Sequence, residues 1–412
     1  MQRAACKPFR TVILAMSLKT IASLFLICAF VFAAKAQLAV KGNLIWTMAG
    51  DPIQNGVIVI KDGKVEAVGP ASRIQIPSGY RVVSADVVTP GLIDAHTVIG
   101  LNGYLNQPHD QMAFDGSSSF QPELRAIDAY NPEERLIQWV REFGVTTIHT
   151  GHQPTALLPG QTMIAKTWGK TVEAATLVPT AMVSVVLGTA ANAGQGKSPG
   201  TRGKQMAILR AELIKAQENL GKKEPPKDLK SEILMRVVKG EVRLLITAHK
   251  DQDIMSALRL AKEFNLKIVL DGASEAPLVI DEIKASGFPV IIHPTMARAS
   301  GDTESLSIET AAKLKAAGIP VALQSGYESY VPKTRVVLFE AAMAAANGLS
   351  KADALALITV DAAKILGLDN RIGSIAVGKD ADIALYDGDP FEYTSHCTGT
   401  IINGQLVNEG VR

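Results

Sequence analysis

The chain has 412 residues, of which 47% are hydrophobic, and its formal net charge is +2. This length allows one large domain with an appendage, or two or three domains of ordinary size. The nearly neutral charge gives no reason to expect nucleic acid or an anionic surface as a partner.

The N-terminal segment differs in composition from the rest of the chain. Residues 1–36 hold five basic residues, no acidic residue and a short apolar run. Ala34-Lys35-Ala36 places small residues where signal peptidase needs them, immediately before Gln37. The pattern predicts a signal peptide over residues 1–36 and an exported, periplasmic protein, with Met1 or Met16 as the true start. The alternative is an uncleaved membrane anchor, for which the apolar run is too short for a comfortable span.

Both ends of the mature chain have the pattern of short strands and tight turns. Within residues 37–88, Asp62-Gly63 predicts a hairpin turn between two apolar runs. Residues 373–412 repeat this pattern of strands and turns. Neither end has enough strands to bury a core alone, so we expect both ends to form one composite β-sandwich.

Residues 89–372 alternate strand-like apolar runs with amphipathic helical stretches. The runs fall at 87–93, 145–149, 162–166, 181–187, 243–247, 267–270, 289–292 and 321–324. Eight such strands separated by helices favour a closed (β/α)8 barrel, of the TIM type, over an open sheet. The expected α/β architecture is therefore a barrel inserted into the sandwich.

Two sequence phrases carry a family resemblance. Thr89-Pro90-Gly91-Leu92-Ile93-Asp94-Ala95-His96 ends the first expected barrel strand, and Val377-Gly378-Lys379-Asp380-Ala381-Asp382 introduces the returning strands. With these phrases the chain resembles the amidohydrolase superfamily, including its imidazolonepropionase-like and dipeptidase-like members. The resemblance covers essentially all of the mature chain. It implies a metal-dependent hydrolase of carbon–nitrogen bonds in cyclic amides or peptide-like substrates.

The resemblance also implies where metal ligands should lie. The family holds one or two divalent metals with histidines on strands one, five and six, an aspartate on strand eight and often a lysine on strand four. His96 occupies one such position, and the others correspond to Val98, Ser184, Thr247, Gly272 and, for the aspartate, Gly326 or Ser325. Valine and glycine have no ligand atom in their side chains, and neutral serine and threonine are poor zinc ligands.

Two interpretations of the metal centre follow. In the first the fold persists and no cofactor is bound tightly. In the second a zinc or manganese site has been rebuilt from His96, His249 and His293, which all fall near strand ends. Asp271 is a candidate catalytic base or lone ligand, and its alternative role is to cap the following helix.

Three functional hypotheses remain open. The chain is an active hydrolase of carbon–nitrogen bonds, or a pseudoenzyme that binds a small molecule, or a partner that stabilises or regulates an intact homologue. A homo-oligomer is a further expectation. No nucleic acid partner and no stable membrane anchor are expected.

Overall fold

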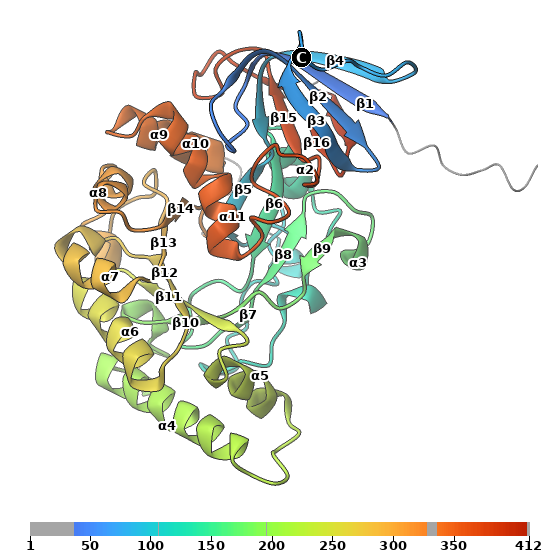
Figure 1. Ribbon diagram of the computed structural model, residues 1–412. Helices are drawn as coiled ribbons and strands as arrows, with labels where there is room; N and C mark the ends of the chain where they lie inside the picture. The colour runs from blue at the N-terminus through green and yellow to red at the C-terminus, as the bar shows by residue number, and fades with distance from the viewer. Residues whose placement is uncertain (1–36, 106, 195, 328–335, 410–412) are drawn as a thin grey trace, which may run out of the picture.

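The computed structural model describes residues 37–105, 107–194, 196–327 and 336–409. The predicted signal peptide lies outside these residues. The fold is of the mixed α/β type, with a β-sheet built from both chain ends above a larger region of alternating strands and helices (Figure 1). Within the described part, no helix is long and apolar enough to cross a membrane.

The strands and helices follow one another as the alternating pattern predicts. The strands are β1 (Leu38–Ile45), β2 (Ile53–Lys61), β3 (Lys64–Pro70), β4 (Arg81–Pro90), β5 (Leu92–Thr97), β6 (Val145–Thr150), β7 (Gly160–Gln161), β8 (Met163–Lys166), β9 (Thr176–Val178), β10 (Met182–Val186), β11 (Arg243–Ala248), β12 (Ile268–Gly272), β13 (Val290–Ile292), β14 (Val321–Leu323), β15 (Ile383–Tyr386), β16 (Cys397–Ile402) and β17 (Gln405–Glu409). The α-helices are α2 (Arg135–Arg141), α3 (Val172–Ala175), α4 (Arg202–Leu220), α5 (Leu229–Val238), α6 (Asp251–Phe264), α7 (Ile280–Ser286), α8 (Thr310–Ala316), α9 (Val337–Ala346), α10 (Lys351–Leu357) and α11 (Val360–Leu366). Short 3-10 turns lie at Pro108–Asp110, Ala126–Asp128, Thr189–Ala191, Ala276–Leu278 and Gly301–Thr303.

Both chain ends contribute to one seven-stranded sheet. Its order is β17-β16-β15-β4-β1-β2-β3, so β4 joins the C-terminal strands to the N-terminal ones. β4 runs parallel to β1 and antiparallel to β15. We call this the terminal sheet. The two ends therefore pair with each other, while the expected second layer of a sandwich and the domain boundaries stay predictions.

The central strands form two further sheets. Their orders are β14-β13-β12-β11-β10-β7 and β5-β6-β8-β9, and β10 to β14 are all parallel. An isolated parallel bridge between Thr97 and Gly326 links the two sheets near β5 and β14. On the other side Thr162, between β7 and β8, exchanges backbone hydrogen bonds with Ala181 and Met182. A closed (β/α)8 barrel stays a prediction.

The third expected barrel strand runs in the opposite direction to the others. β8 is antiparallel to β6, and β7 is antiparallel to β10. The end of β8 therefore lies near the start of β6, where Lys166 is level with Thr147. Lys166 lies neither at the carboxyl ends of the parallel strands nor in solvent, where a lysine at a strand end usually extends. Lys166 is only 2% exposed and donates to Asp380 and Asp382, next to the terminal sheet.

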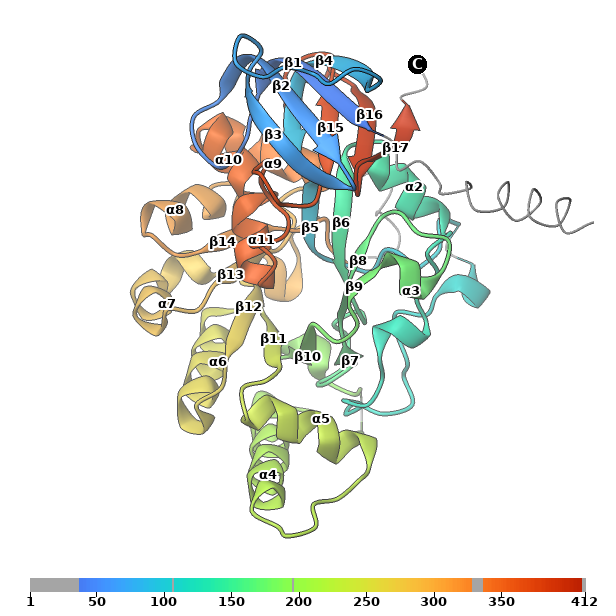
Figure 2. The same cartoon turned by 45° about the vertical axis from the view of Figure 1, so that its right-hand side comes forward.

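An apolar cluster fills one part of the interior between the central strands. Its members are Ile93, Ala95, Ile164, Met182, Leu245, Val269, Ile291 and Ala322 from the strands, together with Ala362, Ala363, Ile365 and Leu366 of α11. Figures 1 and 2 both place α11 against these strands, below the terminal sheet. The helix thus closes one end of the interior with apolar side chains, which leaves the opposite end for polar groups.

Candidate functional site

Polar side chains follow the apolar cluster along several parallel strands. Side chains of a strand alternate between its two faces, so residues two positions apart share a face. Two residues beyond the apolar members Met182, Leu245, Val269, Ile291 and Ala322 stand Ser184, Thr247, Asp271, His293 and Gln324. These five polar residues are all buried. The alternation therefore directs them to the interior, near the carboxyl ends of the strands.

Asp271, on β12, accepts hydrogen bonds from three different strand ends. His96 Nδ1 lies 2.9 Å from Asp271 Oδ1, and Gln324 Nε2 donates to the same oxygen at 2.9 Å. Thr247 Oγ1 donates to Asp271 Oδ2 at 2.6 Å. We call these four residues the Asp271 network. Because Asp271 is fully buried and makes these contacts, its predicted alternative role as a helix cap is not what the structure shows.

The Asp271 network favours a buried ion pair. Burial alone would raise the pKa of Asp271, but the charge of His96 and the hydrogen bonds from His96 and Thr247 together lower that pKa to about 2. Burial likewise tends to lower the pKa of His96, and the Asp271 carboxylate outweighs it, so the pKa of His96 is raised. Both shifts have one cause, because each group stabilises the charged form of the other.

A second buried carboxylate braces the first strand. Asp94 accepts hydrogen bonds from the backbone N–H of Ser325 at 2.9 Å and from Ser325 Oγ at 2.5 Å. Burial raises the pKa of Asp94 to about 7, against the effect of the Ser325 hydrogen bonds. Asp94 therefore ties β5 to the segment after β14.

The two other candidate metal ligands, His249 and His293, lie together, and both contact Tyr327. The rings of His249 and His293 are 5.1 Å apart and almost perpendicular. His249 Nε2 lies 3.0 Å from the Tyr327 hydroxyl, and its Nδ1 lies 2.9 Å from Ser274 Oγ. Tyr327 also places its ring 5.8 Å from that of His96. Tyr327 thus stands between His96 and the other two histidines.

The remaining histidines at the end of β6 are also fixed by protein contacts. His149 Nδ1 lies 2.7 Å from the Ala95 carbonyl oxygen, and its Nε2 lies 2.6 Å from Thr162 Oγ1. Burial lowers the pKa of His149 to about 3, so its ring is neutral. His152 is buried beside Gly160 of β7.

Two of the expected ligand positions have a backbone conformation that disfavours side chains. Gly272 has φ of 78° and Gly326 has φ of 91°, in the left-handed region that residues with a Cβ rarely adopt. A Cβ at Gly272 would lie 2.6 Å from His249 Cε1. Within the described residues, no group of three or more His, Cys, Asp or Glu side chains is placed to hold a metal ion. The residues present therefore do not fit the metal centre that the resemblance implies.

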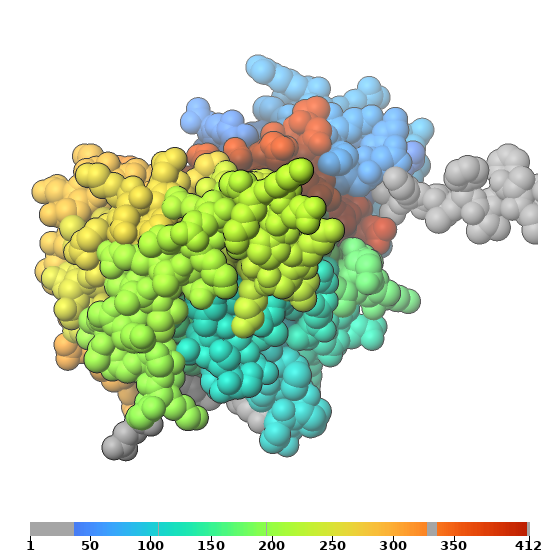
Figure 3. Space-filling model, turned by 90° about the horizontal axis from the view of Figure 1, so that it is seen from below, coloured from blue at the N-terminus to red at the C-terminus, as the bar shows by residue number. Residues whose placement is uncertain are grey.

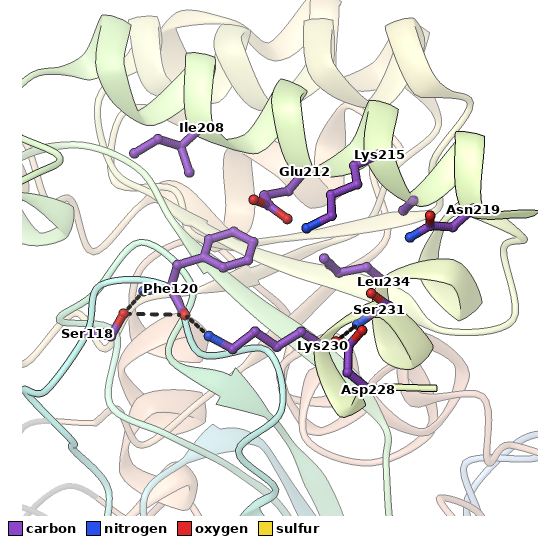
Figure 4. A pocket seen from close by; sticks show the side chains of 11 residues that line it. Ser118, Phe120, Ile208, Glu212, Lys215, Asn219, Asp228, Lys230, Ser231 and Leu234 are labelled. Atoms are coloured by element: carbon purple, nitrogen blue, oxygen red, sulfur yellow. Dashed lines mark hydrogen bonds between the residues drawn. The ribbon is translucent and has the colours of Figure 1, made fainter. Parts of the chain in front are cut away.

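The polar strand ends are distinct from a surface pocket on the opposite side from the terminal sheet. A cavity of about 290 Å³ lies between α4, α5 and the segment around Phe120, with Glu212, Lys215 and Lys230 at its walls (Figure 4). In Figure 3, α4 and α5 in green lie beside the cyan segment that follows β5. None of the histidines or Asp271 lines this cavity.

The comparisons with known proteins show the family. The sequence profile described as "Amidohydrolase family" matches residues 99–408. The chain belongs to the amidohydrolase family. Imidazolonepropionase from Fusobacterium nucleatum is 24% identical over 90% of this chain and 97% of its own length.

Solved amidohydrolase structures share this fold. The amidohydrolase from Thermotoga maritima MSB8 is 26% identical, with a TM-score of 0.85 over 90% of this chain and 100% of that one. The putative prolidase from Bifidobacterium longum has a TM-score of 0.57 at 19% identity, over 92% of this chain and 96% of that one, and supports the fold alone. Membership in the amidohydrolase family implies the fold of a hydrolase that acts on carbon–nitrogen bonds.

The sequence did not single out Gln324 or Tyr327. Gln324 ends the last expected strand run, and the period-two alternation from Ala322 was a signal that it faces the interior. From the sequence Thr247 is only a position without a metal ligand, whereas in the structure its hydroxyl donates to Asp271.

Proposed function

We propose that this chain is an exported member of the amidohydrolase family that binds a small molecule at the carboxyl ends of its central strands without the family's metal-dependent hydrolysis. Binding takes place in a strand-end site like that of a TIM-type barrel, which we propose as the arrangement of the central strands. Export rests on the basic, acid-free segment 1–36 and places the protein in the periplasm.

The observation that carries the proposal is the occupation of Asp271. Both of its carboxylate oxygens accept hydrogen bonds from protein groups, namely His96, Gln324 and Thr247. A catalytic zinc normally needs three protein ligands and one open position. Asp271 already accepts hydrogen bonds from three donors, and His96 is the one histidine at an expected ligand position. These two residues do not supply the three protein ligands that a catalytic zinc needs.

The glycine backbone supports the same conclusion. A histidine at position 272 or an aspartate at position 326 would need a φ that their side chains disfavour, by about 1–2 kcal/mol. At Gly272 it would also need His249 to move. We therefore expect that a single substitution at either position does not create a metal ligand unless the local backbone also moves.

Metal analysis of the mature protein tests this proposal. Protein purified from the periplasm without chelator should contain far less than one zinc or manganese per chain. Its thermal midpoint should not change when EDTA is added, because there is no bound ion whose removal shifts the folding equilibrium. Dipeptides and cyclic amides should not be hydrolysed.

The test variant is His96→Ala. Its matched control is His109→Ala, which replaces an exposed histidine. Stoichiometric zinc or manganese in the wild type that is lost in His96→Ala and kept in His109→Ala would overturn the proposal. The same result would identify a rebuilt metal centre and an active hydrolase.

A further inference from the structure

The cavity between α4, α5 and the segment around Phe120 is separate from the strand-end residues. Its volume is about 290 Å³, and its walls carry both charged and apolar side chains (Figure 4). Small-molecule sites commonly have volumes of about 300–1,000 Å³, so this cavity has the size for a small ligand. We call it the α4–α5 pocket.

One side of α4 forms a wall of the α4–α5 pocket. Ile208, Glu212, Lys215 and Asn219 follow one another at intervals of three or four residues, which places them on one side of the helix. Figure 4 shows these side chains along the α4 wall. Charged residues on a partly exposed helix face are ordinary, but the buried amide of Asn219 is not.

Asn219 has an unused hydrogen-bond donor at this wall. The residue is 1% exposed, and its Oδ1 accepts from Lys222 Nζ at 2.7 Å. Its amide NH2 donates to no other described residue. A buried NH2 group without an acceptor is costly, and Asn219 lines the pocket, so a ligand acceptor there would satisfy it.

Glu212 and Lys215 also make no hydrogen bond or ion pair with any residue that the structure describes, although they are one helical turn apart. The other charged side chains of the pocket are engaged. Asp228 caps α5 by accepting from the backbone N–H of Ser231 at 2.9 Å, and Lys230 has an acidic partner at 3.4 Å. The hydrogen bonds of Ser231 lower the pKa of Asp228, and the charge of Lys215 adds a smaller effect. One acid, one base and one amide donor therefore remain for a ligand.

We propose that the α4–α5 pocket binds a free amino acid with an apolar side chain, through its ammonium and carboxylate groups. The ligand carboxylate accepts from Lys215 and from the NH2 of Asn219, and the ligand ammonium donates to Glu212. Lys215 and Asn219 are four positions apart on one side of α4, so both donors can meet one carboxylate. Glu212 lies one turn before Lys215, which suits the short separation between the two charged groups of an α-amino acid.

The remaining lining favours an apolar side chain and a ligand without net charge. Phe120, Ile208 and Leu234 line the pocket, and Figure 4 shows the Phe120 ring opposite α4. These apolar surfaces suit an aliphatic group. The two acids and two bases of the lining balance each other, so a ligand with a net charge would be left uncompensated.

The α4–α5 pocket is a second site, beyond the strand-end site of the proposed function. No histidine lines it, and binding there needs no metal ion. Its ligand can therefore be tested whether or not the strand ends bind a small molecule.

Isothermal titration calorimetry of the mature protein tests the ligand class. The probes are L-leucine, N-acetyl-L-leucine, which lacks the ammonium group, and L-leucinamide, which lacks the carboxylate. We expect saturable binding of L-leucine and at least about 10-fold weaker binding of each analogue, because each loses hydrogen bonds to a charged group. No binding of L-leucine, or equal binding of L-leucine and either analogue, would overturn the proposal.

Variants of α4 assign the binding to the pocket. Glu212→Gln and Lys215→Met should each weaken L-leucine binding at least about 10-fold. Glu218→Gln and Lys204→Met are the matched controls, since both residues are exposed on α4 outside the pocket, and they should leave the affinity unchanged. All four positions are partly or fully exposed, so we expect the variants to fold. Unchanged affinity in both pocket variants would overturn the proposal.

A strand-end variant separates this site from the one under the proposed function. His96→Ala should leave L-leucine binding unchanged, because His96 does not line the α4–α5 pocket. Binding that is lost in His96→Ala and kept in Glu212→Gln would assign L-leucine to the strand ends. That result would overturn the α4–α5 site and leave small-molecule binding at the strand ends standing.

Discussion

Replacing Lys166 by methionine should destabilise the protein strongly, because the ammonium group holds β8 to the terminal sheet. Lys166 Nζ donates to Asp380 Oδ2 at 2.7 Å, Asp382 Oδ1 at 3.0 Å and Asn403 Oδ1 at 2.5 Å. These contacts use all three hydrogens of the ammonium group. Methionine has a similar length and retains the packing of the stem, so the variant removes mainly the charge and the hydrogen bonds.

The size of the loss in stability depends on which partners Asp380 and Asp382 keep when Lys166 is replaced. Asp380 keeps Lys64 and Arg371 as charged partners. Asp382 is 6% exposed and keeps only the backbone N–H of Asn403 at 2.9 Å among its described donors. Breaking a buried pair so that one carboxylate is left uncompensated costs about 3–5 kcal/mol. We expect a loss of this size in the free energy of unfolding.

The pH dependence of this loss has a definite sign. Burial raises the pKa of Asp382 already in the wild type, and Lys166 opposes that rise. Without Lys166 the pKa of Asp382 in the folded state rises further above its unfolded value. The folded state then prefers the protonated carboxyl, so stability is gained at low pH and lost as pH rises through the folded pKa. The penalty should therefore be larger at about pH 8 than at about pH 5.

Urea unfolding of wild type and Lys166→Met at several pH values measures both effects. Lys313→Met is the control, since Lys313 pairs with Glu309 at 2.8 Å on the surface with both side chains about half exposed. Its cost should be at most about 0.5 kcal/mol. Adding Asp382→Asn to Lys166→Met should recover part of the loss. A Lys166→Met variant within about 1 kcal/mol of the wild type would refute this reasoning.

Three further predictions concern the candidate site, the terminal sheet and export. Gly272→Ala should cost about 1–2 kcal/mol for its φ of 78°, plus the displacement of His249. Gly287→Ala is the control, because Gly287 has φ of 71° and open space where a Cβ would lie, so the variant should cost only the backbone strain. Equal thermal midpoints for the two variants would contradict the predicted clash between a Cβ at position 272 and His249. Deletion of residues 383–412 should cause aggregation on size-exclusion chromatography, because it uncovers the edge of β4 that pairs with β15. A monodisperse truncated protein would show that the pairing is dispensable. N-terminal sequencing of periplasmic protein should begin at Gln37, and an intact segment 1–36 would exclude cleavage.

The sequence by itself determined the order of elements and the family. Apolar runs bounded by turn residues placed the expected strands close to where β6, β10, β11, β12, β13 and β14 lie, because a strand buried on both faces is continuously apolar. The phrases around His96 and Asp380 pointed to the amidohydrolase family, and the profile match over residues 99–408 confirmed it.

Only the tertiary structure decided the direction of β8 and the fate of Lys166. A strand's apolar pattern reads the same in either direction, so neither its antiparallel pairing with β6 nor the position of its last residue followed from periodicity. The buried acids at Asp380 and Asp382 are more than 200 positions away in the chain from Lys166, so no local signal joined them.

The contacts of the candidate site likewise depended on the fold. The sequence predicted that His96, His249 and His293 lie near strand ends, and it indicated Asp271 as a candidate base or ligand. It did not predict which of these side chains contact one another. The structure joins His96 and Gln324 to Asp271, and joins His249 to Tyr327 and Ser274. The position of a residue at a strand end tells only how far along the strand its side chain lies. The order of the strands and their register decide which other side chains it contacts. The left-handed backbone at Gly272, which disfavours a ligand side chain there, is a property of the folded chain alone.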